Sequence, residues 1–120
     1  MDEYFKSLLT QISESYNFLK DMKDEPNQLD TIKVQLDKIQ GLIKVLCIKI
    51  EASHNESDDF SELFKFAKRY LENYDFKHII DTFQLYSEDV MRIRNIRISI
   101  LSSLEESKLI SKIQSMLHDS

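Results

Sequence analysis

Three arginines close together in the second half of the chain are the residues best suited to recognising a charged partner. They are Arg92, Arg94 and Arg97, and the rest of the chain relies mostly on lysine for positive charge. Arginine can bind a carboxylate or a phosphate through two parallel hydrogen bonds, which lysine cannot do. On a helix, Arg94 and Arg97 lie about one turn apart and can reach one anionic partner, while Arg92 points to the other flank.

The charge of the chain leaves more than one interpretation of these arginines open. Residues 1–60 carry 12 acidic residues against 7 lysines and no arginine, whereas residues 61–120 carry 9 residues of each sign. The arginines can pair with the acidic first half of the same chain or of a second copy, or they can contact an acidic protein partner or nucleic acid. The net charge of −5 argues against non-specific binding to nucleic acid, which needs an excess of positive charge.

Residues suited to catalysis are few and scattered. The chain has three histidines and one cysteine, namely His54, His78, His118 and Cys47. No histidine has a neighbour at the spacing of a catalytic triad or a zinc protease motif. Cys47 falls on the apolar side of a predicted helix, where a thiol serves as a small core residue. His54, Asp58 and Asp59 would give only three exposed loop ligands, so we expect no metal site. Because the residues suited to catalysis are few and scattered, we also expect no cofactor and no enzyme activity.

The composition excludes several classes of protein. One glycine and one proline in 120 residues cannot supply the turns of a β-sandwich or the glycine-rich loop of a nucleotide-binding site. A single cysteine excludes an intramolecular disulfide. The chain starts with acidic residues and has no long uncharged run, so we expect a cytoplasmic or nuclear protein without membrane insertion.

The elements that position these residues are predicted to be helices throughout, because apolar residues recur every three or four positions. The helices are expected to end at polar segments such as 23–27 and 53–59, which contain the proline or N-cap residues. We predict an all-α fold, an antiparallel bundle of five or six helices, forming one domain over residues 1–120. The first helix is expected to cover about residues 3–22 and the last one residues 104–118. The helices between them carry the apolar residues from Leu29 to Ala52, from Phe60 to Tyr74, from Phe76 to Phe83 and from Val90 to Leu104.

The second predicted helix carries two apolar stripes. One is a heptad seam made of Leu29, Ile32, Leu36, Ile39, Ile43, Leu46 and Ile50. The other lies roughly 120–180° around the helix and contains Val34, Gly41, Val45, Ile48 and Ala52. Two interpretations stay open: the helix is covered on both sides by its own neighbours, or the second stripe is a contact surface for another chain.

Two further segments offer candidate contact residues. Phe66 and Tyr70 lie at the edge of the apolar face of the third helix, where they serve the core or line a groove for a partner helix. In the last segment the apolar direction reverses, and the sequence from Ser103 to Glu106 matches a capping box. We therefore predict a helix break near residues 102–104, with Ile113 and Leu117 either folding back onto the bundle or docking onto a partner.

The abundance of apolar helix surface and the scarcity of catalytic residues favour a non-catalytic interaction protein. An adaptor, an assembly subunit or a dedicated chaperone would bind another protein through an apolar helical face, and a homodimer is a further possibility. The alternatives are a nucleic-acid-associated regulator that uses the arginines and an inhibitor or immunity-type protein that covers a basic target. The expected partner-binding residues are Val34, Val45, Ile48, Phe66, Tyr70, Arg92, Arg94, Arg97, Ile113 and Leu117.

Overall fold

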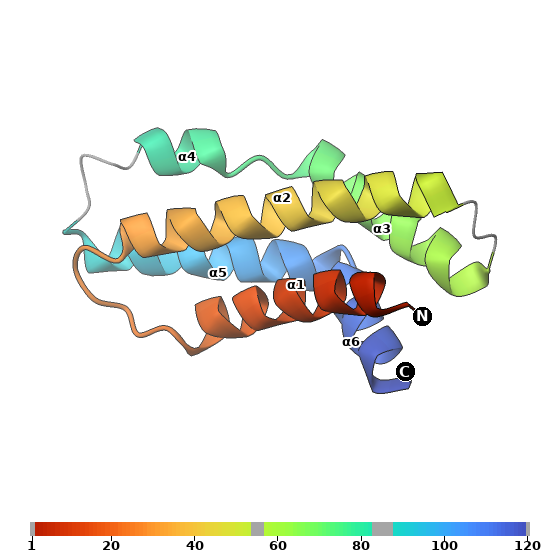
Figure 1. Cartoon of the computed structure of the whole chain (residues 1–120). Helices are drawn as coiled ribbons and strands as arrows, with labels where there is room; N and C mark the ends of the chain where they lie inside the picture. Colours follow the sequence, from red (N-terminus) through yellow and green to blue (C-terminus); the bar gives the residue numbers. More distant parts are fainter. Residues whose placement is uncertain (1, 54–56, 83–87, 120) are drawn as a thin grey trace.

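The protein is an all-α helical bundle (Figure 1). The computed structural model describes residues 2–53, 57–82 and 88–119, and within these ranges it has six helices and no strand. The helices are α1 (Glu3–Asp21), α2 (Leu29–Ser53), α3 (Asp58–Asn73), α4 (Lys77–Thr82), α5 (Val90–Glu106) and α6 (Leu109–Asp119). His54, considered above as a metal ligand, lies outside the described residues.

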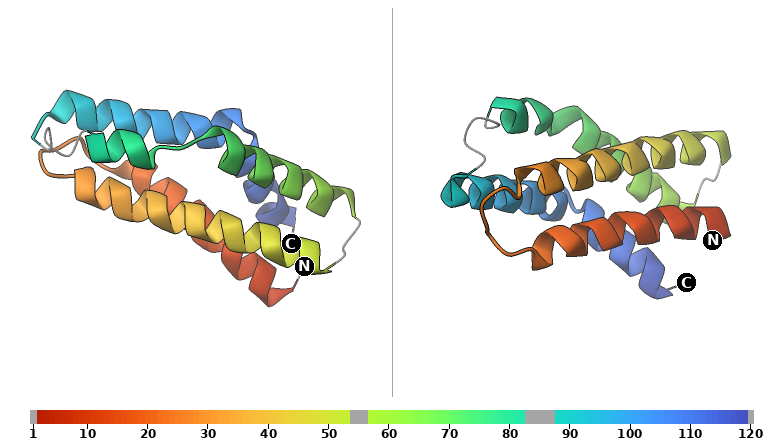
Figure 2. Two further views of the ribbon diagram at one scale, coloured as in Figure 1. Left: turned by 90° about the horizontal axis from the view of Figure 1, so that it is seen from above. Right: turned by 60° about the vertical axis from the view of Figure 1, so that its left-hand side comes forward.

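Successive long helices run in opposite directions (Figures 1 and 2). Helices α1 and α2 lie antiparallel to each other, and α3 followed by α4 runs back antiparallel to α2. Helix α5 packs against α1 and α2, and α6 packs against α1, α3 and α5. The predicted all-α bundle is therefore confirmed, and of the two predicted helix numbers, five and six, the described residues form six.

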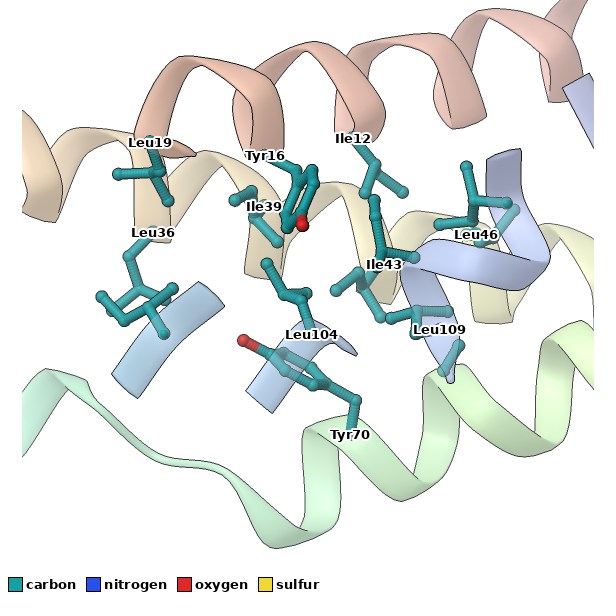
Figure 3. Packing of buried hydrophobic residues seen from close by; sticks show 14 of the residues in the cluster. Ile12, Tyr16, Leu19, Leu36, Ile39, Ile43, Leu46, Tyr70, Leu104 and Leu109 are labelled. Carbon is teal, nitrogen blue, oxygen red and sulfur yellow. The ribbon is translucent and has the colours of Figure 1, made fainter. Parts of the chain in front are cut away.

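The heptad seam of α2 lies at the centre of the core. Its seven residues are all buried, as predicted, and face the buried side chains of α1, α3, α5 and α6 (Figure 3). Ile12, Tyr16 and Leu19 point towards this seam from α1, and Leu104 and Leu109 reach it from the C-terminal part of the chain. Because α2 is covered along this whole stripe, it fixes the positions of the other helices around it.

Side-chain caps set three of the helix starts. The Asp2 carboxylate accepts a hydrogen bond from the backbone N–H of Phe5, and the Ser57 hydroxyl accepts one from that of Phe60. The Asp89 carboxylate likewise accepts from the backbone N–H of Arg92. Each cap satisfies a backbone donor that has no partner inside its own helix.

The predicted helix break near residues 102–104 is wrong. Helix α5 continues to Glu106, and the buried Ser103 hydroxyl donates a hydrogen bond to the carbonyl of Ile100 within the helix and does not cap a new one. The chain turns at Ser107 and Lys108 instead, where Lys108 has a left-handed backbone with φ of 66°. A residue in this conformation ends a helix and redirects the chain.

The last helix folds back onto the bundle. Leu109 and Ile113 of α6 are completely buried, and Leu117 is half-buried against the core. Lys112 ties α6 to α3 through ion pairs of 2.7 Å with Asp59 and 3.0 Å with Glu62, and these hydrogen bonds raise the pKa of the lysine. Of the two alternatives for this segment, the structure shows the fold-back.

Candidate interaction surface

The second apolar stripe of α2 is left uncovered by the rest of the described chain. Val34, Val45 and Ile48 are 62%, 39% and 66% exposed, and Gly41 and Ala52 are exposed as well. We call these five residues the outer α2 face. The stripe points away from the core because it lies opposite the buried seam on the same helix. The covering of α2 on both sides by its own neighbours, which was one of the two interpretations, is therefore not what the structure shows.

Gly41 lies in the middle of the outer α2 face and has open space around it. A Cβ atom built on Gly41 would meet no heavy atom within 4 Å. A glycine inside a helix costs about 1 kcal/mol relative to alanine. No close approach by another described helix accounts for this cost within a single chain.

Two exposed aromatic residues of α1 add to the apolar surface beside α2. Tyr4 is 50% exposed and Phe18 is 48% exposed. The ammonium group of Lys49 on α2 lies 4.9 Å from the centre of the Tyr4 ring, so Tyr4 stands next to the C-terminal half of α2. Phe18 follows Tyr4 by 14 residues, which returns it to nearly the same side of α1.

Oppositely charged residues border the outer α2 face. Asp37 and Lys44 are exposed, and neither forms an ion pair with another residue in the described ranges. At about 100° per residue the two side chains lie on the same flank of the stripe, roughly one helical turn on either side of Gly41. The flank thus offers one free negative and one free positive charge.

The arginine cluster is engaged inside the chain. The Arg97 guanidinium donates through Nε and Nη2 to the two carboxylate oxygens of Asp24, at 2.9 and 3.2 Å, and through Nη1 to the carbonyl of Leu19 at 3.0 Å. The side chain of Arg97 is only 11% exposed. Arg94 lies 3.8 Å from the same Asp24, and Arg92 pairs with Asp89 at 3.3 Å. Arg94 and Arg97 therefore pair with the acidic first half of the same chain, which is one of the interpretations that the sequence leaves open, and the largely buried Arg97 joins α5 to the segment after α1.

Two other expected contact residues belong to the core. Tyr70 and Ile113 are both fully buried, so neither can reach a partner on this fold. Tyr70 does not line an open groove, because its side chain is fully buried beside Leu104 (Figure 3), and burial raises the pKa of its hydroxyl. The buried Tyr70 hydroxyl has no hydrogen-bond partner among the described residues. Phe66 is half-buried against the core.

A basic hollow on α3 was not found by sequence reasoning. It has a volume of about 610 Å³ and is lined by Phe64, Lys65, Lys68, Arg69, Glu72 and Asn73. The spacing of Lys65, Lys68 and Arg69 by three and four residues places these cations on one side of the helix and was the available signal. Glu72 lies within the same hollow, so its lining carries both signs of charge.

The side chains suited to metal binding lie apart from one another in the described parts of the chain, and the only cysteine of the sequence is Cys47. No three His, Cys, Asp or Glu side chains among the described residues are grouped so as to hold a metal ion. Burial raises the pKa of the half-buried Cys47 thiol, and the nearby Glu51 adds to the effect. A raised thiol pKa leaves less of the reactive thiolate at neutral pH.

None of the helices in the described ranges combines the length and the apolar character that crossing a bilayer requires.

Comparisons with known proteins give no relative for this chain. Comparison with protein-family models, with curated protein sequences and with solved structures finds no significant match.

Proposed function

We propose that this protein is a non-catalytic interaction module that binds another protein chain through the outer α2 face. The observation that carries the proposal is the exposure of Val34 and Ile48 at 62% and 66% on the same face as a glycine with open space around it. Apolar side chains in a row on one side of a helix provide a continuous contact surface. A glycine between them allows a second helix to approach closely.

The energetics favour covering this face. Full burial of a valine or isoleucine side chain contributes about 1.5–3 kcal/mol. Val34, Val45 and Ile48 are 62%, 39% and 66% exposed, so covering each of them would contribute roughly half of that value. An adaptor, an assembly subunit and a dedicated chaperone would each use a face of this kind. The nucleic-acid alternative draws no support from Arg97, because that side chain is bound to Asp24.

Site-specific photo-cross-linking in the native cell tests the proposal. A photoreactive phenylalanine derivative replaces Val45 or Ile48 in two separate variants, and Glu106, which is exposed at the end of α5, is the matched control position. We expect a defined cross-linked product, identified by mass spectrometry, from both α2 positions and not from position 106. Equal background labelling at all three positions would contradict the proposal.

A further inference from the structure

We propose that the chain recognised by the outer α2 face is a second copy of this protein, with the two α2 helices packed antiparallel and crossing at Gly41. The inference rests on the proposed function of this face and names its partner. In a two-fold symmetric dimer the same surface of both copies must be complementary to itself. The outer α2 face and its borders meet this condition in three independent ways.

The apolar residues are placed symmetrically about Gly41. Val34 precedes Gly41 by seven residues and Ile48 follows it by seven. When two such helices run antiparallel and cross at their glycines, Val34 of one copy lies level with Ile48 of the other, and the two-fold symmetry forms this contact twice. Both side chains are among the most exposed apolar residues of the described chain, at 62% and 66%.

The free charges on the flank are complementary under the same symmetry. Asp37 lies four residues before Gly41 and Lys44 lies three residues after it, on the same flank of the stripe. In the antiparallel pair each Asp37 therefore comes within one residue's rise of the Lys44 of the other copy. A parallel pairing would put the charged flanks of the two copies on opposite sides of the interface and leave Asp37 and Lys44 seven residues apart in height, so these ion pairs form only in the antiparallel orientation.

The exposed aromatic residues of α1 follow the same two-fold arrangement. Helix α1 runs antiparallel to α2 (Figure 1), and Tyr4 stands beside Lys49. Seven residues further along α1, Gln11 is therefore about level with the centre of the outer α2 face. Tyr4 and Phe18 each lie seven residues from Gln11. Tyr4 of one copy is thus nearly level with Phe18 of the other, which continues the apolar contact from α2 onto α1.

Gly41 would form the crossing point of the two helices. No heavy atom lies within 4 Å of a Cβ built on Gly41, so the backbone of a second helix can approach there without displacing any side chain. Crossing at glycine lets helix backbones approach more closely than larger side chains allow. The dimer thereby accounts for the presence of the only glycine of the chain at the centre of the face.

Charge reversal tests the dimer and its symmetry together. Sedimentation equilibrium is measured for the wild type, for Asp37→Lys, for Lys44→Asp, and for an equimolar mixture of the two variants. We expect the wild type to dimerise at micromolar concentration, each single variant to dimerise at least about tenfold more weakly, and the mixture to recover the wild-type affinity through paired opposite charges. Glu106→Lys and Lys65→Asp reverse charges at exposed positions outside the face and should dimerise as the wild type does.

Two results would overturn the dimer. One is a wild type that stays monomeric up to high micromolar concentration while circular dichroism shows the expected helix content. The other is a mixture that dimerises no better than its components. A monomeric protein that still forms cross-links to a different protein from position 45 or 48 would refute the dimer alone, whereas the absence of any such cross-link would refute the proposed function as well.

Disulfide trapping checks the register on a Cys47→Ala background. Gly41→Cys should oxidise to a covalent dimer, and a mixture of the Val34→Cys and Ile48→Cys variants should cross-link much faster than either variant does alone. Rapid self-cross-linking of the Val34→Cys variant would show a parallel pairing and would contradict the proposed arrangement.

Discussion

At the scale of single residues, the structure assigns the arginines different environments although they lie within six positions of one another. Arg97 is largely enclosed and makes three hydrogen bonds of 3.2 Å or less to Asp24 and to the end of α1. Arg92 and Arg94 keep about half of their side chains exposed and have longer ion pairs. Residue type and spacing alone do not distinguish these cases, because the difference comes from the position of Asp24 in the loop after α1.

We predict that Arg97 contributes to stability and the exposed Arg92 contributes little. Arg97→Ala should lower the free energy of unfolding by about 1.5–3 kcal/mol, because it removes charge-assisted hydrogen bonds from a mostly buried group. Arg92→Ala should change it by about 0–1 kcal/mol, as expected for a surface ion pair. Urea unfolding of both variants measures the difference. Equal losses would show that the Arg97 contacts with Asp24 and Leu19 do not hold α5 against α1.

A second residue-scale prediction concerns alkaline pH. Burial and the hydrogen bond that Tyr16 donates to Glu105 raise the pKa of the tyrosine from 10.0 to about 12. The folded state therefore holds this proton more tightly than the unfolded chain, so the stabilisation is complete below about pH 10 and is lost as pH rises towards 12.

The free energy of unfolding should consequently fall between about pH 10 and 12, and Tyr16→Phe should make that fall shallower by removing the titrating group. Urea unfolding at a series of pH values across this range measures the slope. Tyr4→Phe is the matched control, since it removes the hydroxyl of a half-exposed tyrosine on the same helix. An unchanged slope in Tyr16→Phe would mean that Tyr16 titrates alike in both states.

At the scale of the elements, the strongest periodicity led to the most accurate predictions. The heptad spacing of α2 identifies all seven of its buried residues, because a stripe that repeats every seven positions stays on one side of a helix. The end of α5 could not be predicted in the same way. The sequence from Ser103 to Glu106 resembles a helix start, yet tertiary packing buries Ser103 and Leu104 inside a continuing helix. Local patterns favour caps at several places, and packing decides which of them is used.

The candidate surface was predictable only as a choice between two alternatives. The spacing of Val34, Val45 and Ile48 identifies a second apolar stripe but not whether a neighbour covers it. Similarly, Tyr70 and Phe66 lie at the edge of one helical face, and the packing of α3 against α2 and α6 leaves Tyr70 fully buried. Coverage depends on the arrangement of several helices, which single-helix periodicity does not contain.

The turn between α5 and α6 allows an element-scale prediction. Lys108 and Asn27 both have φ of 66°, a left-handed conformation that costs most residues about 1–2 kcal/mol but that asparagine tolerates. Lys108→Gly should therefore raise the free energy of unfolding by about 0.5–1 kcal/mol, the gain being reduced by the greater freedom of glycine in the unfolded chain. Asn27→Gly is the control and should change it little. Thermal or urea unfolding decides, and destabilisation by Lys108→Gly would show that the lysine makes contacts that outweigh its backbone strain.

At the scale of the whole molecule, the bundle closes one side of the core and leaves one helix face open. The folded-back α6 covers the ends of α1, α3 and α5, and its Lys112 ion pairs attach it to α3. No comparable element lies over the outer α2 face in the described part of the chain, where Val34 and Ile48 remain exposed. The stability of the single chain and its association through α2 therefore depend on different residues and can be changed separately.

Replacing Gly41 should change these two properties in opposite directions. Glutamine forms helices better than glycine does, so Gly41→Gln should stabilise the single chain by about 0.5–1 kcal/mol, since nothing lies within 4 Å of the added Cβ. The long polar side chain would at the same time keep two α2 helices apart at their crossing point. Association stabilises a folded protein by mass action, so the melting temperature of the wild type should rise with protein concentration. The Gly41→Gln variant should melt higher than the wild type at low concentration and gain little more at high concentration. Differential scanning fluorimetry over a wide concentration range measures both effects, and parallel concentration dependence in the two proteins would contradict the placement of Gly41 at an interface.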